Sequence, residues 1–397
     1  MTTATATSPL DAALDRAARI TPRLAELADP IDRGEADPAR AYDLVRASGL
    51  LAAMIPADRG GLGLDFADYT RLLAELARAN GAVALGYNMH NVAIGSLFEA
   101  DADALGAAGS TFRDRVIDRV IDHGAMFASA ASEPATGARL RGIATVYRRD
   151  DDDRFVLDGH KSFVSLSGVA DHYVVTARPH DDDSGVEVSH FVVDADDPGV
   201  TFSTEWAGTA LRGTSTAQMF LSDTVIDADR LFLGVEGMSL FKAVREPHWM
   251  AAGYLGAYLG LAEAIVEFAA ARIGADERRR SSDADIARLG AMGVDLQAAR
   301  ALTLVAARGV ARNRSHQDTN ATVYAAKHHL GETTQKLAAQ AVSLVGSAAM
   351  AADGPMQRLL REVQFCSIMP AKPADCLSYV GRGLLGVNMF DVSNHSW

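Results

Sequence analysis

The pattern of apolar and polar positions divides the chain into three parts. From Pro9 to about Met126, segments such as ARAYDLVRASGL and FADYTRLLAELARANGA carry apolar residues three and four positions apart, which is typical of helices with one buried face. From Phe127 to about Leu233 the apolar residues form short runs, including RFVLDG, KSFVSLS, HYVVTA, HFVVDA and AQMFLSD, separated by Asp- and Gly-rich turns. The middle part is therefore predicted to be a small β domain.

The third part, from Gly234 onward, is predicted to be helical again. Its long segments are HWMAAGYLGAYLGLAEAIVEFAAARI, DIARLGAMGVDLQAARALTLVAARGVARN and TVYAAKHHLGETTQKLAAQAVSLVGSAAM. Small residues on several of their faces indicate helices packed closely in an antiparallel bundle. The order helix, β, helix is neither a βαβ pattern nor an internal repeat.

Composition narrows the class of protein. The chain has 397 residues and 48% hydrophobic content, enough for large cores, so it is expected to be globular. The formal net charge is −13, which makes nucleic acid and anionic membrane surfaces poor partners. The N-terminus lacks the features of a signal peptide, and no uninterrupted apolar stretch approaches the roughly 18 residues of a membrane span. We expect no membrane partner and a cytoplasmic location.

Several kinds of site lack their signatures. No GxGxxG follows a predicted strand, and neither GxxxxGK[ST] nor GxSxG occurs. Cys366 and Cys376 form no CxxC pair, and their apolar neighbours favour buried thiols over redox partners. The pair His328–His329 has no nearby companions, which favours a solvated helix face. We predict no metal site.

Three stretches of the middle part carry a family resemblance. They are ASAASEPATGAR at 128–139, DGHKSFVSLSGVADHYVVTA at 158–177 and TALRGTSTAQMFLSDTVIDADRLF at 209–232. SEPATGAR is similar to the flavin-binding TEPxAGSD of the acyl-CoA dehydrogenase flavoprotein family, and GHKSFVSL is similar to its GxKxWITN. The N-terminal stretch SGLLAAMIPADRGGLGLDFADYTRLLAELARANGA also resembles that family.

The resemblance implies a fold and an assembly. The fold is α+β, with an N-terminal helical domain at 1–126, a middle β-barrel or sandwich domain at 127–234 and a C-terminal four-helix bundle at 235–397. The cofactor implied is FAD, and the assembly implied is a homotetramer or homodimer.

The resemblance also assigns flavin contacts residue by residue. Ala131 and Ser132 lie in the flavin loop, with Ser132 in place of a threonine. Phe163 replaces the tryptophan that covers one flavin face, and Ser165 replaces the threonine at the flavin edge. In the alternative interpretation Phe163 is an inward strand residue and Ser132 a turn residue.

Two further flavin residues are expected in the helical bundle. Arg272 falls where the family places an arginine that binds the flavin pyrophosphate across a subunit interface, and Gly346 falls near the adenosine half. The family's RxxFG is here RIGADERRRSSD. One of Arg278, Arg279 and Arg280 would therefore take over the phosphate contact, unless this basic run is a solvated face.

The catalytic base is the main departure from the family. Dehydrogenation of an acyl thioester needs a carboxylate to remove the α-proton. Most relatives hold a glutamate in a YEGT loop, where this chain reads MPAK with Pro370 in the place of the acid. A minority resembling isovaleryl-CoA dehydrogenase place it seven residues before a glycine, as Glu246 lies before Gly253. Glu246 is thus either the base or a helix cap or salt-bridge residue.

The resemblance therefore predicts an FAD-dependent dehydrogenase that introduces an α,β double bond into an acyl-CoA or acyl-carrier substrate. An electron-transfer flavoprotein would be its acceptor. Ala138 and Pro247 replace a serine and an arginine that help to hold CoA in relatives, which weakens the thioester assignment. The alternatives are a reduced-flavin-dependent monooxygenase acting on a small molecule, and a flavin-free scaffold.

Overall fold

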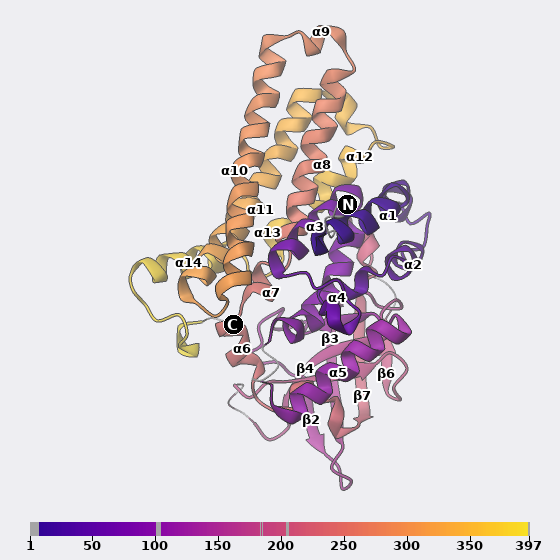
Figure 1. Ribbon diagram of the computed structural model, residues 1–397, viewed down its shortest axis with the longest axis vertical. Helices are drawn as coiled ribbons and strands as arrows, with labels where there is room; N and C mark the ends of the chain where they lie inside the picture. The colour runs from indigo at the N-terminus through magenta and orange to yellow at the C-terminus, as the bar shows by residue number, and fades with distance from the viewer. Residues whose placement is uncertain (1–7, 101–104, 183, 185, 204–205, 396–397) are drawn as a thin grey trace, which may run out of the picture.

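The computed structural model describes residues 8–395 apart from 101–104, 183, 185 and 204–205. It confirms the α+β class, with helices at both ends of the chain and a curled sheet between them (Figure 1). Short 3-10 turns connect many of the elements. They are η1 (Leu50–Ala52), η2 (Ala57–Arg59), η4 (Arg212–Thr214), η5 (Ala228–Arg230), η6 (Phe232–Gly234), η7 (Ser347–Met350) and η8 (Val392–Asn394).

The N-terminal part is helical, as the apolar spacing predicted. Its helices are α1 (Pro9–Asp32), α2 (Ala39–Ala47), α3 (Phe66–Ala79), α4 (Gly81–Glu99) and α5 (Gly106–His123). Side-chain caps begin three of them, because Ser8, Asp65 and Asn80 accept hydrogen bonds from the N–H groups of Asp11, Asp68 and Val83. Helix α4 is buried on nearly every face, so it forms the centre of this part.

The middle part is one seven-stranded sheet. Its strands are β1 (Phe127–Ala130), β2 (Val146–Arg149), β3 (Phe155–Val164), β4 (His172–Pro179), β5 (Ser189–Asp194), β6 (Val200–Phe202) and β7 (Ala217–Ile226). The order is β1-β4-β2-β3-β7-β6, with β5 on β4. RFVLDG and KSFVSLS were predicted as separate strands, which is wrong, because both belong to β3. Gly159 continues the strand there, and a Cβ at this position would lie 2.4 Å from Thr145 Oγ1.

The C-terminal part contains a column of three long helices, α8 (Leu255–Gly274), α10 (Asp283–Asn313) and α11 (Gln317–Val345), which extends away from the sheet (Figure 1). The shorter helices are α6 (Ser239–Arg245), α7 (His248–Ala251), α9 (Glu277–Arg280), α12 (Pro355–Glu362), α13 (Phe365–Ile368) and α14 (Pro373–Leu384). The sequence predicted one helix from His248 onward, which is wrong. The chain turns after α7, where the Ala252 and Gly253 N–H groups both bond to the His248 carbonyl.

Small residues let the C-terminal column pack against the N-terminal helices. A Cβ on Gly256 of α8 would lie 2.5 Å from the Thr70 carbonyl of α3, and one on Gly260 would lie 2.3 Å from that of Ala74. This is the close helix packing that the small residues predicted. Residues 248–274 are long and apolar enough to cross a membrane by composition, but 61% of their most apolar window is buried inside the protein, as in a core helix.

Candidate flavin site

The loop after β1 is hydrogen-bonded to two neighbouring strands. The carbonyl of Ser132 accepts a bond of 2.8 Å from the Ser162 N–H of β3, and the carbonyl of Ala131 accepts one of 3.4 Å from Thr176 Oγ1 of β4. Ala131 also packs against an apolar cluster that includes Leu240 of α6. The backbone of this loop is therefore fixed between the sheet and the start of the C-terminal part.

A buried ion pair lies directly behind the loop. The ammonium group of Lys161 lies 2.7 Å from Oε1 of Glu133 and donates to Thr176 Oγ1 at 3.0 Å, and both charged side chains are almost fully buried. The Glu133 carboxylate also accepts bonds from the Ala144 and Thr145 N–H groups and from the Thr145 hydroxyl. Glu133 lies in SEPATGAR and Lys161 in GHKSFVSL, but neither was predicted as a site residue from the sequence.

The two charges are matched to this environment. Burial opposes ionisation of Glu133, but the positive charge of Lys161 and the hydrogen bonds to the carboxylate outweigh it and hold the Glu133 pKa below its usual value. Burial lowers the pKa of Lys161 to about 8, although the neighbouring carboxylate opposes this shift. The Glu133–Lys161 pair therefore connects the flavin loop to β3 and β4, and each of its charges is compensated by the other.

Phe163 does not point into the core. Its side chain is 62% exposed, and its φ of 52° is in the left-handed region that non-glycine residues rarely adopt. The interpretation of Phe163 as an inward strand residue is therefore wrong. Ser165 contacts Thr216 through their hydroxyls at 3.2 Å, and the buried hydroxyl of Ser162 has no hydrogen-bond partner within the described part of the chain.

These features fit a flavin ring. An exposed aromatic face can stack on a planar ring, and small residues at Ala131 and Ser132 let the ring approach backbone. The unpartnered hydroxyl of Ser162 can satisfy a polar atom of the ring edge. Ala131, Ser132, Phe163 and Ser165 would hold the isoalloxazine, which supplies redox chemistry when bound.

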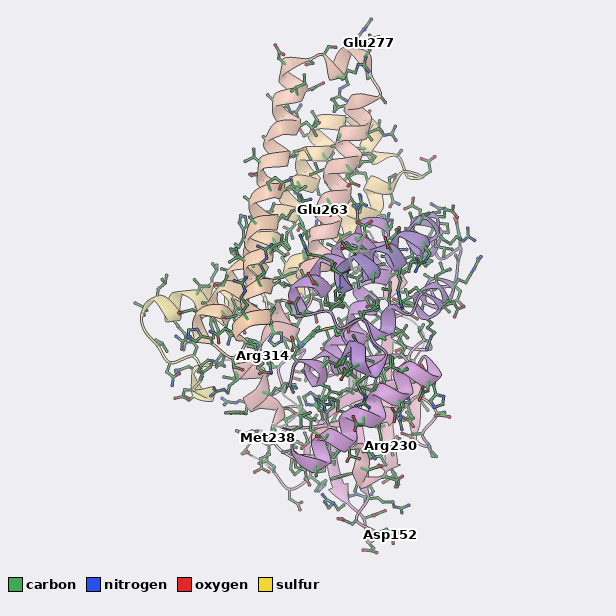
Figure 2. All side chains as sticks on the ribbon, viewed as in Figure 1. Asp152, Arg230, Met238, Glu263, Glu277 and Arg314 are labelled. Carbon is green, nitrogen blue, oxygen red and sulfur yellow. The ribbon has the colours of Figure 1, made fainter. Side chains whose placement is uncertain are left out.

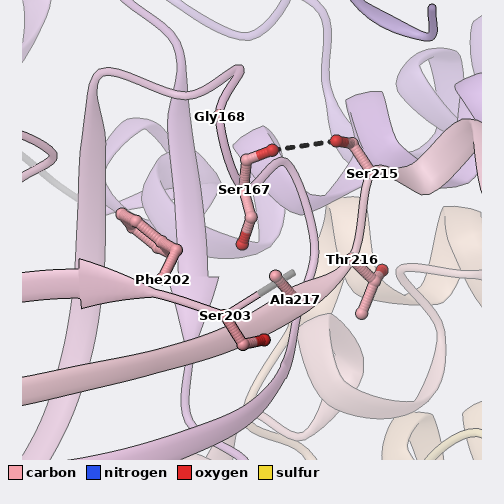
Figure 3. Close-up of a pocket in the computed structure, with 7 residues that line it drawn as sticks. All are labelled: Ser167, Gly168, Phe202, Ser203, Ser215, Thr216 and Ala217. Atoms are coloured by element: carbon pink, nitrogen blue, oxygen red, sulfur yellow. Dashed lines mark hydrogen bonds between the residues drawn. The ribbon is translucent and has the colours of Figure 1, made fainter. Parts of the chain in front are cut away.

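A pocket of about 180 Å³ adjoins these residues (Figure 3). It is lined by Ser167, Gly168, Phe202, Ser203, Ser215, Thr216 and Ala217, of which Thr216 contacts Ser165. The Ser215 hydroxyl donates to the Ser167 carbonyl at 2.8 Å across its upper wall, as Figure 3 shows. The lining carries hydroxyl groups and no charged side chain, so this pocket does not suit a phosphate group.

Glu246 is the C-cap residue that follows α6, and it does not begin a long helix. Its carboxylate accepts a hydrogen bond from the Ser315 hydroxyl at 2.8 Å and lies 3.4 Å from Nε of Arg314. Figure 2 places Arg314 beside α6, at the sheet end of the helical column. The contacts are those of a salt-bridge residue, and no capping bond to α7 is formed.

The loop that carries Pro370 connects α13 to α14. The buried ammonium group of Lys327 on α11 donates to the carbonyls of Cys366 at 2.8 Å, Met369 at 3.2 Å and Ala371 at 3.3 Å. No carboxylate side chain is in this loop. Burial raises the pKa of Cys366 to about 12 and that of Cys376 to about 11, so both are inert buried thiols, as expected.

The two remaining flavin candidates lie at the other end of the molecule. Arg272 is exposed in the last turn of α8, and Gly346 is the C-cap residue that follows α11. These two helix ends lie next to α9, at the end of the column away from the sheet (Figure 1). Arg279 is already engaged, because its guanidinium pairs with Asp285 at 2.9 Å and donates to the carbonyls of Leu344 and Val345. The structure thus brings Ala131, Ser132, Phe163 and Ser165 together, and leaves Arg272 and Gly346 apart from them within one chain.

Family models match most of the chain. They are the N-terminal domain of acyl-CoA dehydrogenase at residues 13–103, its middle domain at 128–224 and its C-terminal domain at 245–370. Among curated proteins, an amino sugar nitrososynthase, DnmZ, of Streptomyces peucetius is 28% identical over 94% of this chain and 93% of its own length. The mitochondrial short-chain specific acyl-CoA dehydrogenase of Mus musculus is 26% identical over 87% of this chain and 82% of its own length.

Solved structures superpose on this chain over nearly its whole length. KijD3, in complex with FMN and a dTDP-linked amino sugar, superposes with a TM-score of 0.85 at 26% identity and covers 98% of both chains. Butyryl-CoA dehydrogenase from Megasphaera elsdenii has a TM-score of 0.85 at 20% identity, covering 96% of this chain and 99% of its own, and shows the fold alone. The chain belongs to the acyl-CoA dehydrogenase family of flavin-dependent oxidoreductases.

Proposed function

We propose that this protein is a reduced-flavin-dependent monooxygenase that oxygenates a nitrogen or sulfur atom of a small molecule. The observation that carries the proposal is the state of the two positions where the family holds its base. Position 370 is occupied by proline, which has no acidic group. The carboxylate of Glu246 accepts a hydrogen bond from the Ser315 hydroxyl and lies beside the Arg314 guanidinium. The carboxylate of Glu246 is thus engaged by two neighbouring side chains and is not free to act on a substrate in this arrangement.

Oxygenation does not need a strong base to remove an α-proton. When bound, reduced flavin would supply the two electrons with which one oxygen atom of O₂ is added to the substrate and the other is released as water. The role of this chain is to bind the flavin through the loop after β1 and through Phe163, and to place the substrate beside it.

Relatives support this reaction class. The nitrososynthase DnmZ and the isobutylamine N-hydroxylase of Streptomyces viridifaciens, which is 26% identical over 86% of this chain, are named for oxidation at nitrogen. We therefore favour an amine as the substrate. Sulfur stays a second choice, because the structural neighbour named as a dibenzothiophene monooxygenase shares only 21% identity.

The form of the flavin is part of the proposal. FAD, expected from the resemblance, would need Arg272 of a second copy of the chain for its pyrophosphate and Gly346 for its adenosine half, which is consistent with a homodimer or homotetramer. FMN lacks the pyrophosphate and the adenosine half, so it would need neither residue in those roles. Equilibrium titration of the apoprotein with FMN and with FAD distinguishes the two, because only FAD binding would weaken in Arg272→Ala.

The second candidate is dehydrogenation of an acyl thioester, with transfer of electrons to an electron-transfer flavoprotein. It is favoured by the seven-residue spacing from Glu246 to Gly253 and by the contact of α6 with the flavin loop. Under this candidate Glu246 would leave Arg314 and Ser315 when substrate binds.

The test supplies the purified protein with flavin, a flavin reductase, NADH and isotope-labelled O₂. Isobutylamine and dibenzothiophene serve as probes because similar proteins are named for them, and a dTDP-linked amino sugar and indole because they are bound in solved structures of similar proteins. A product that carries one labelled oxygen atom supports the proposal. Formation of an enoyl-CoA from an acyl-CoA, without a reductase, would support the second candidate instead.

A further inference from the structure

A tryptophan outside the recognised motifs stands beside Phe163. The Trp206 ring lies edge-on to the Phe163 ring, with centroids 5.7 Å apart and planes at 78°. On its other side it meets Phe365 of α13 at 6.0 Å and 77°. The three rings form a continuous row from the flavin candidate on β3 to the helix that precedes the Pro370 loop.

The main chain at Trp206 is hydrogen-bonded, and Gly208 leaves room for the indole ring. The main-chain N–H of Trp206 donates to the Thr216 carbonyl at 2.8 Å, and the main-chain carbonyl of Trp206 accepts from the Gly208 N–H at 2.8 Å. A Cβ on Gly208 would lie 2.3 Å from Cζ3 of the indole. The backbone of Gly208 is outside the left-handed region, so the ring, and not the backbone conformation, requires glycine here.

The exposure of the row is unusual for aromatic side chains. Phe163 is 62% exposed and Trp206 is 38% exposed, whereas most aromatic residues of this chain are buried. A ring that packs against Phe163, Phe365 and Gly208 but is left partly open to solvent is suited to cover a flat ligand.

We propose that Trp206 is a second aromatic wall of the flavin site, which contacts the isoalloxazine ring beside Phe163 and closes the site toward α13. The inference rests on the flavin-binding part of the proposed function and is the same for oxygenation and dehydrogenation. The competing explanation is a structural one, in which Trp206 only joins the sheet to the C-terminal helices through Phe365.

Equilibrium titration of apoprotein with FMN, followed by flavin fluorescence, tests the inference. Trp206→Leu removes the ring, and Gly208→Ala displaces it without removing it. Both are expected to raise the Kd for FMN about threefold to tenfold, which corresponds to about 0.7 to 1.4 kcal/mol. Both are also expected to raise the emission of the bound flavin, because an indole in contact with the ring quenches it. Trp206→Phe keeps an aromatic wall and is expected to change the Kd less.

The control is Phe220→Leu, which removes an aromatic residue that is 36% exposed and stacks on His160 at 4.4 Å in the same sheet. It is expected to leave the Kd and the bound emission unchanged. Far-ultraviolet circular dichroism and thermal melting establish that each variant is folded, and Trp206→Phe provides the comparison if Trp206→Leu does not fold.

The results distinguish a flavin contact of Trp206 from a purely structural role. Weaker binding of FMN with higher emission of the bound flavin in both Trp206→Leu and Gly208→Ala supports the assignment of Trp206 as a second aromatic wall. A wild-type Kd and wild-type emission in both variants would overturn the assignment. Weaker binding with unchanged emission would also overturn it and would support the structural role. If wild-type protein bound neither FMN nor FAD, the proposed function would fail together with the inference.

Discussion

Replacing Lys161 with methionine removes the cation from the buried pair behind the flavin loop and keeps most of the volume of the side chain. The Glu133 carboxylate, which is 3% exposed, then keeps its bonds from Ala144 and Thr145 but loses its counter-ion at 2.7 Å. Removing one partner of a buried ion pair typically costs about 3 to 5 kcal/mol, because a buried charge is left uncompensated. That is a large part of the roughly 5 to 15 kcal/mol that stabilises a typical folded protein.

Thermal unfolding followed by circular dichroism measures this cost. A loss of this size is expected to lower the Tm by roughly 5 to 15 °C. The double variant Glu133→Gln/Lys161→Met removes both charges and is expected to be more stable than the sum of the two single losses predicts. Flavin affinity is expected to fall in Lys161→Met as well, because the pair connects the Ala131–Ser132 loop to β3 and β4.

The matched control is an exposed ion pair of the same sheet. Arg148 and Asp223 are 2.8 Å apart, with side chains 49% and 79% exposed. Exposed pairs contribute about 0 to 1 kcal/mol, so Arg148→Met should hardly change the Tm. An equal fall in Tm for Lys161→Met and Arg148→Met would refute the reasoning, since it would show that burial of the first pair gives it no special weight.

Three further predictions concern single side chains. Glu246→Gln is expected to leave the oxygenation rate within about twofold of wild type, whereas a fall of roughly 10²- to 10⁴-fold in product formation would identify a catalytic base. Lys327→Met leaves carbonyls of residues 366–371 unpaired, at a cost of about 2 to 4 kcal/mol, and should speed amide hydrogen exchange in that loop, unlike Lys336→Met at an exposed pair on the same helix. The folded-state pKa of Glu133 lies below the usual 4.5, so the ionised carboxylate stabilises the fold above pH 4.5, and this stabilisation is lost as the pH falls through the folded-state pKa. The Tm values of wild type and Glu133→Gln, measured by thermal unfolding at decreasing pH, should therefore converge.

The three-part plan could be predicted because each part has its own period of apolar residues. Helix α10 ends at Asn313, where the predicted segment ends, but α11 ends at Val345, before the predicted end at Met350, because Gly346 leaves the helical conformation. The turn between α7 and α8 was missed, since the apolar spacing continues through it while the backbone hydrogen bonds do not. The joining of two predicted strands into β3 depends on the close approach of Thr145 to Gly159, which is a contact between distant segments.

The flavin loop could be found from its motif, but its support could not. Lys161 and Glu133 are 28 positions apart, and nothing in their local sequence shows that they pair. Trp206 lies between a strand and a turn, with no periodic pattern around it, so only the packed structure shows its contact with Phe163. The engagement of Glu246 by Arg314 and Ser315 depends in the same way on where the connection from α10 to α11 lies.

The most direct test of the proposed function follows the visible absorbance of the oxidised flavin in the loaded protein, without oxygen, during titration with butyryl-CoA, isovaleryl-CoA and cyclohex-1-ene-1-carbonyl-CoA. The engaged Glu246 and the Pro370 loop predict that no acyl-CoA bleaches the flavin, whereas a chemical reductant does. Bleaching by any of these thioesters that disappears in Glu246→Gln would contradict the account and establish a dehydrogenase with Glu246 as its base.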